Sequence, residues 1–223
     1  MRIGAHVSAA GGLSNAPARA AALGANCAQV FLSGPTNWRM PIHDEAQIAG
    51  FREQVAQLDV TPVVAHAIYL INLASPDDRI WRQSMDSLVG YLELGDRLGL
   101  AGVVTHLGSH KKLGFAAVQD RLFEAVGLVL RRAAGSTPLL MEVCAGQGGN
   151  IGARFEELGA ILKALDGDSR LGICLDTAHM LASGYDVATQ DGLESTVASL
   201  EREVGLDRIA VVPVSYTHLR AHE

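Results

Sequence analysis

Five residues able to bind metal ions close or follow short apolar runs of the chain: His66, His106, Glu142, Asp176 and His179. Each of the first four ends a run that reads as a β-strand, and His179 follows Asp176 by three residues. Such side chains are costly to bury unless they are paired or bound to something. Histidine and carboxylate ligands without thiolates suit zinc or manganese in a hydrolytic centre. The pattern therefore predicts a cluster of divalent metals that hydrolyses its substrate.

Taken singly, each of these residues has a simpler interpretation. A lone buried histidine is more often a hydrogen-bonded core residue, and a lone carboxylate at a strand end is more often a helix cap or a salt-bridge partner. Four consecutive strand ends favour the metal site instead. Glu142 could bridge two ions, and ions about 3.5–4 Å apart can activate a water and stabilise a leaving oxygen. We therefore predict Glu142 as a catalytic residue as well as a ligand.

The elements that must position these residues are short, apolar and rich in β-branched side chains. They are apolar on both faces, which is typical of a parallel sheet covered by helices. The predicted strands are Arg2–His6, Ala28–Leu32, Pro62–His66, Gly102–His106, Leu139–Val143, Leu171–Asp176 and Arg208–Val212.

Helical periodicity falls between the strands. Four stripes at helical spacing are interpreted as core-facing. They begin at Trp81, Phe115, Phe155 and Leu193 and end at Leu92, Ala133, Leu165 and Val204. Ahead of the first stripe, Ser75 and Pro76 predict a helix start, with Ser75 as N-cap and Pro76 at the first helical position.

Strict alternation of strands and helices, with polar residues ending several strands, favours a (β/α)8 TIM barrel over an open doubly wound sheet. An open sheet would gather its site at one crevice, whereas barrels collect catalytic groups at the carboxyl ends of many strands. A complete barrel has eight units and typically about 250 residues. This chain of 223 residues offers about seven β units, so we predict an incomplete barrel.

Composition narrows the function classes. The net charge of −6 argues weakly against a nucleic-acid partner, although bound metals would reverse the sign locally. No apolar run approaches the roughly 20 residues needed to span a bilayer, and the apolar stretch at the N-terminus is too short for a signal peptide. We expect a cytoplasmic monomer without a membrane partner, with Cys27, Cys144 and Cys174 as buried free thiols.

Motifs around the predicted ligands resemble the endonuclease IV family, the deoxyribonuclease IV or AP endonuclease family 2 group of abasic-site endonucleases. The resemblance covers residues 1 to about 212. The matching segments are GAHVSAAGGL at 4–13, YLINL at 69–73, GSH at 108–110, AGQG at 145–148 and DTAH at 176–179.

The resemblance implies a barrel with three zinc ions that cuts double-stranded DNA on the 5′ side of an abasic site in base-excision repair. It assigns His66, His106 and Glu142 to the first ion. Glu142 also bridges to the second ion, which Asp176 binds, and His179 belongs to the third. Manganese is the alternative metal.

By the same resemblance, Tyr69 and Leu70 match the segment that enters DNA at the lesion. Simple packing is the alternative for Leu70. The family's intercalating arginine is replaced by Thr36, and the sequence leaves open whether Arg39 takes its place.

The sequence departs from the family after Val212, where Pro213 stands in place of a metal-binding histidine. We expect a barrel domain at 1–212, a C-terminal truncation and a tail at 213–223 of artefactual origin. His218 and His222 are then not native ligands, and the chain binds fewer than three zinc ions.

Two other hypotheses stay open. A metal-dependent sugar isomerase or epimerase on a related barrel shares strand-end His and carboxylate ligands. An inactive fragment is the third hypothesis, because the resemblance places further ligands beyond Val212.

Overall fold

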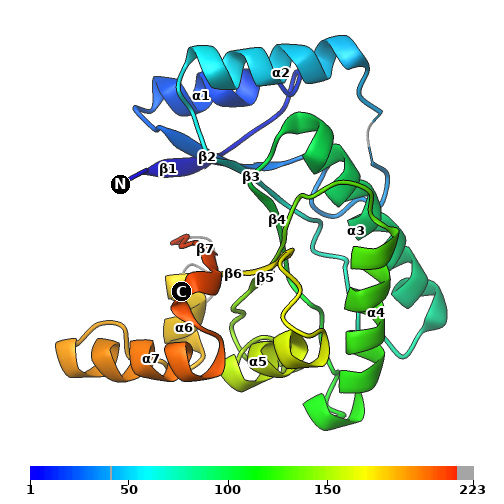
Figure 1. Ribbon diagram of the computed structural model, residues 1–223, viewed down its shortest axis with the longest axis vertical. Coiled ribbons are helices and arrows are strands. Elements are labelled where there is room, and N and C mark those ends of the chain that lie inside the picture. Colours follow the sequence, from blue (N-terminus) through cyan, green and yellow to red (C-terminus); the bar gives the residue numbers. More distant parts are fainter. Residues whose placement is uncertain (41, 215–223) are drawn as a thin grey trace. The chain divides into compact units, whose positions relative to one another are not determined.

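The computed structural model describes residues 1–40 and 42–214, and strands alternate with helices along them (Figure 1). Contacts divide the chain into two compact units. Unit 1 comprises Met1–Leu70, Asp86–Thr105 and Val129–Leu139; unit 2 comprises Ile71–Met85, His106–Leu128 and the chain from Leu140 onward.

Seven strands lie in the described part of the chain. They are β1 Gly4–Val7, β2 Cys27–Phe31, β3 Val63–His66, β4 Gly102–Thr105, β5 Leu139–Glu142, β6 Leu171–Cys174 and β7 Ile209–Val211. All seven predicted strands are confirmed, with bounds that differ by two residues or fewer. Strands β3 to β6 are buried at every residue, as expected for a sheet covered on both faces.

The helices follow the strands. They are α1 Asn15–Ala22, α2 Glu45–Gln57, α3 Asp78–Leu98, α4 Gln119–Arg132, α5 Phe155–Ala164, α6 Thr177–Ala182 and α7 Gln190–Glu203. Their apolar stripes match the predicted ones, with two corrections. Phe115 lies in a short 3-10 turn ahead of α4, and Leu193 and Val197 of α7 are 41% and 38% exposed, so that end of the fourth stripe does not face the core.

The predicted start of α3 is also wrong. The helix begins at Asp78, and Asp77 caps it by accepting the backbone N–H groups of Arg79 at 2.8 Å and Ile80 at 3.2 Å. Ser75 instead accepts the N–H of Asp77. Both Ser and Asp are good N-caps; the acid nearer the periodic stripe takes the position.

In unit 1, β1 to β4 pair in parallel in chain order. Helices α1 and α2 pack against each other, and α1 covers β1 and β2 (Figure 1). The core contains Val30, Phe51, Leu88 and Tyr91, all at most 1% exposed. The Tyr91 hydroxyl shares a 2.6 Å hydrogen bond with Ser33, so its polar end is satisfied.

In unit 2, β6 pairs in parallel with β7, and Val143 after β5 donates its N–H to the carbonyl of Cys174. Helices α5 and α7 pack side by side (Figure 1). Leu107, Leu122, Met141 and Phe155 are fully buried in this core. The alternation in both units thus places the last residue of each strand next to the loop that follows it.

The cysteine expectation holds in part. Cys144 and Cys174 are buried free thiols, whereas Cys27 is only half-buried. Among the described residues, no helix has the length and apolar character needed to cross a membrane. His218 and His222 lie outside the described residues.

Candidate metal centre

Four of the predicted ligands belong to unit 2, and their places in the fold follow from the strand ends. His106 comes directly after β4, and Glu142 is the last residue of β5. Asp176 follows β6 by two residues and is the N-cap of α6, on which His179 lies. Glu142, Asp176 and His179 are at most 4% exposed, and His106 retains 24% of its side-chain surface.

Glu142 joins the two histidines of this unit. Its Oε2 lies 3.1 Å from Nε2 of His106, and its Oε1 lies 3.2 Å from Nδ1 of His179. The two oxygens of this carboxylate therefore face different imidazole rings. The bridging role predicted for Glu142 stays a prediction.

The two oxygens of Asp176 have different surroundings. Oδ1 accepts the backbone N–H groups of Ala178 at 2.9 Å and His179 at 3.0 Å. Oδ2 is buried and has no hydrogen-bond partner among the described residues. A buried carboxylate oxygen without a partner is costly, and a divalent cation would satisfy it. Ligand atoms of Glu142, Asp176 and His179 all lie within 4.8 Å of one another, which is a spacing that one ion can span.

Backbone carbonyls orient the histidine rings. His179 Nδ1 lies 3.0 Å from the carbonyl oxygen of Val143. In unit 1, His66 Nδ1 lies 2.6 Å from the carbonyl oxygen of Ala67. Because a carbonyl oxygen only accepts hydrogen bonds, Nδ1 carries a proton in both contacts. Metal-binding histidines commonly donate their other ring N–H in this way, so the donor set fits a divalent metal.

The charges of this cluster raise the basicity of His179. Burial alone would lower its pKa, but the hydrogen bond and charge of Glu142, together with the charge of Asp176, leave the pKa above the ordinary value. Nearby, burial raises the pKa of Cys144 and Cys174 well above the ordinary range, and the charges of Glu142 and Asp176 raise it further. Both cysteines are therefore thiols at neutral pH.

The remaining sequence-predicted residues lie in unit 1. His66 is the last residue of β3, is 5% exposed, and packs its ring against Phe31 and Tyr69, with centroids 5.2 and 5.5 Å away. Tyr69 is 49% exposed and its N–H donates to the carbonyl of Pro35. Leu70 is half-buried. Thr36 and Arg39 are both exposed.

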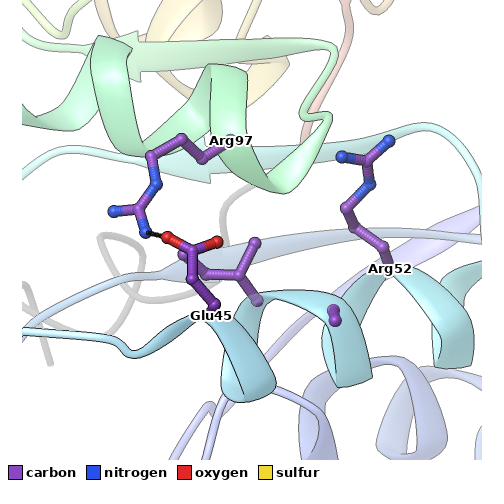
Figure 2. Close-up of a pocket in the computed structure, with 5 residues that line it drawn as sticks. Glu45, Arg52 and Arg97 are labelled. Carbon is purple, nitrogen blue, oxygen red and sulfur yellow. Dashed lines mark hydrogen bonds and ion pairs between the residues drawn. The ribbon is translucent and has the colours of Figure 1, made fainter.

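Unit 1 also has a shallow pocket of about 450 Å³, lined by residues of α2 and α3: Glu45, Ile48, Ala49, Arg52 and Arg97. Arg97 forms an ion pair with Glu45 at 2.5 Å. Figure 2 shows this pair, with Arg52 apart from it. The lining of this pocket contains one carboxylate, no imidazole and none of the site residues predicted from the sequence. We therefore do not assign the metal chemistry to it.

Sequence reasoning missed the groups that orient the ligands. The carbonyls of Ala67 and Val143 are backbone atoms, so no residue type marks them. The only available signal was their position beside a predicted ligand, one residue after His66 and one after Glu142.

Residues 17–220 match a family model described as xylose isomerase-like TIM barrel. A probable endonuclease 4 from Halothermothrix orenii is 36% identical over 212 residues, which are 95% of this chain and 76% of that protein. The crystal structure of endonuclease IV from Thermus thermophilus is similar with a TM-score of 0.83 at 38% identity, covering 95% of this chain and 75% of that one.

The chain belongs to the endonuclease IV family. Endonuclease IV proteins are nucleases, so the chain is classed as a hydrolase, and the predicted TIM-barrel class is confirmed. A D-tagatose 3-epimerase-like protein has a TM-score of 0.72 at 21% identity over 94% of this chain and 75% of that chain. At that identity, the likeness shows only that the fold is shared.

Proposed function

We propose that this endonuclease IV chain is a zinc-dependent enzyme that hydrolyses the phosphodiester on the 5′ side of an abasic site in double-stranded DNA during base-excision repair. The observation that carries the proposal is the buried group of Glu142, Asp176 and His179, in which an oxygen of Asp176 lacks a partner among the described residues. Family membership supplies the substrate class.

The proposed ligand roles are those that the resemblance to the endonuclease IV family implies. His66, His106 and Glu142 are assigned to the first ion, Glu142 and Asp176 to the second, and His179 to the third. Zinc suits imidazole and carboxylate ligands, with manganese as the alternative. When bound, such ions lower the pKa of water towards 7 and neutralise charge on a phosphodiester.

Residues of the chain also orient the imidazole rings and are assigned to the contact with DNA. Glu142 holds the rings of His106 and His179 through its two oxygens. The Val143 carbonyl keeps the proton of His179 on Nδ1. Tyr69, which is exposed three residues after β3, and Leu70 are both assigned to the contact with DNA. An abasic nucleotide has no stacked base and is cheap to extrude, which favours lesion recognition.

The sugar isomerase or epimerase alternative rests on the shared barrel alone. The epimerase-like structures fall below the identity at which activity carries over. We therefore keep the endonuclease as the proposed function and use the sugar reaction as the competing outcome.

The test is cleavage of two labelled duplexes of equal sequence, one with a single abasic site and one intact. We expect the zinc-loaded protein to cut only the abasic duplex, on its 5′ side, and to lose activity in a chelator. Glu142→Gln should abolish cleavage. Ketose–aldose interconversion without any cleavage of the abasic duplex would overturn the proposal.

A further inference from the structure

The lysines of this chain are few and unevenly placed. There are three, at positions 111, 112 and 163, and two of them are adjacent. Lys111 and Lys112 lie in the loop at 107–114, which begins directly after the candidate ligand His106. Both are exposed, and the neighbouring Leu113 is 59% exposed.

The backbone holds both lysines in an unusual conformation. Lys111 has φ 46° and Lys112 has φ 73°, the left-handed region that residues with a Cβ rarely adopt. The turn that contains them closes on His110, whose carbonyl accepts the N–H of Leu113 and whose Nδ1 accepts the N–H of Gly114. Residues in such strained conformations persist only where surrounding contacts fix them, and they are common at functional sites.

A second loop, at 143–154, fixes the first one. Ser109 and Asn150 form an antiparallel bridge, His110 donates its N–H to Gly149, and Ile151 donates its N–H to Gly108. The hydroxyl of Ser109 donates to the carbonyl of Gly148 at 2.7 Å. The second loop directly follows the candidate ligand Glu142. Backbone hydrogen bonds therefore connect the loop that carries the lysines to a segment that begins at a candidate metal ligand.

The charge of these two loops is positive. Residues 107–114 and 143–154 contain no aspartate or glutamate, and they carry Lys111, Lys112 and the exposed Arg154. An acid from another element, Asp77, lies near Lys111. The backbone amides of Ile80 and Arg79 are the main cause of its lowered pKa, and Arg79 and Lys111 add to it. Asp77 is already engaged as the cap of α3.

We propose that Lys111 and Lys112 form a contact for the phosphate backbone of duplex DNA beside the candidate metal centre. The inference rests on the proposed function. A chain with a net charge of −6 needs local cations to approach DNA, since phosphate contacts come mainly from Lys and Arg. The contact reads no base, so it acts equally on abasic and intact duplex.

The experiment measures binding of abasic and intact duplexes by fluorescence anisotropy as a function of salt. The test variant Lys111→Asn/Lys112→Asn removes both charges and keeps residues that tolerate left-handed backbone. Lys111→Arg/Lys112→Arg keeps the charges. Lys163→Gln is the matched control, because Lys163 is the third lysine and lies exposed on α5.

The Asn variant should weaken binding of both duplexes by the same factor. The slope of log affinity against log salt should become shallower by about 1 for each lysine. On abasic duplex, KM should rise while kcat stays unchanged. The Arg variant and Lys163→Gln should keep the original slope.

The outcomes separate this inference from the function on which it rests. If the original protein binds no DNA, both are overturned. If it cuts abasic duplex but the Asn variant keeps the original salt slope, the phosphate contact alone is overturned. An equal loss in Lys163→Gln would also overturn it, because the effect would then be one of overall charge.

Discussion

The carboxylate of Asp176 accepts the backbone N–H of His179 at 3.0 Å, so the first turn of α6 holds these two candidate ligands together. The same oxygen caps the helix through Ala178, and the other oxygen is the buried one without a partner among the described residues. The two roles of Asp176 can therefore be separated by substitution.

Asp176→Asn should keep the cap and lose the ligand charge. Asn is as good an N-cap as Asp, so the variant should unfold without metal at about the same temperature as the original protein. Zinc affinity should fall more than roughly tenfold, because changes even to groups behind a ligand cost that much. Calorimetric zinc titration and thermal denaturation in chelator measure the two effects.

Asp176→Ala is the matched comparison, since it removes both functions. It should lose the same zinc affinity and also about 1 kcal/mol of stability from the missing cap. If Asp176→Asn binds zinc as tightly as the original protein, Asp176 is not a ligand.

Zinc should stabilise the folded chain in proportion to the logarithm of its free concentration. A ligand that binds only the folded state at about 1,000 times its Kd adds about 4 kcal/mol. For a chain of this size, each kcal/mol raises Tm by about 2–4 °C. We expect a zinc-dependent rise of about 10 °C by differential scanning calorimetry, reversed by chelator.

Magnesium at the same concentration is the control for ionic strength, because imidazole ligands select against it. Elemental analysis of the loaded protein counts the zinc ions that each chain binds. A Tm that is independent of zinc would argue against a metal site in the folded chain.

Gly108→Ala should be strongly destabilising. Gly108 has φ 106°, and an added Cβ would lie 2.2 Å from Oδ1 and 2.5 Å from Cα of Asn72. Backbone cannot yield cheaply at that distance, and Ala strains at positive φ. We expect the free energy of unfolding to fall by about 2–4 kcal/mol in urea denaturation.

The control is Gly50→Ala in α2, where an added Cβ has nothing within 4 Å. This variant should instead gain about 0.5–1 kcal/mol of unfolding free energy. Equal effects of the two substitutions would contradict this interpretation of the contact.

Glu157→Gln should become relatively more stabilising as pH rises. Burial raises the pKa of Glu157, while the amides of Gly152 and Arg154 partly offset it. The folded state therefore keeps this proton to higher pH than the unfolded chain. Its contribution to stability is present below the unfolded pKa and is lost as pH rises through the folded one.

The difference in unfolding free energy between Glu157→Gln and the original protein should thus grow between about pH 4 and pH 7. Glu156→Gln, on the exposed side of α5, corrects for the change in overall charge. A difference that stays constant across this range would show that Glu157 titrates alike in both states.

The strands were predictable because their signal is local. Four fully buried strands, β3 to β6, are continuous apolar runs that end at or next to a polar residue or a thiol, so both their type and their end could be inferred from the sequence. The start of α3 was not predictable, because Ser75 and Asp77 are both competent N-caps and the choice between them depends on how the loop packs. The exposure of Leu193 and Val197 likewise depends on what covers α7, which periodicity does not encode.

The candidate site was predictable to the level of residue types and no further. Strand-end His106 and Glu142 stand 3.1 Å apart, as convergence on one rim implies. The unequal oxygens of Asp176 depend on how α6 leaves its strand, and the turn with the two left-handed lysines is held by hydrogen bonds from a distant loop. Contacts of that kind join residues about 40 positions apart, as Ser109 and Gly148 show, and leave no mark in local sequence.

The bridge between Ser109 and Asn150 has a consequence for how this chain can change over generations. Surface loops usually tolerate insertions and deletions independently. Here the backbone hydrogen bonds of one loop end on the other, so a change of length in either would break the pairing of both. Variation in these two loops should therefore come as substitutions, or as matched changes of length in both loops that are inherited together.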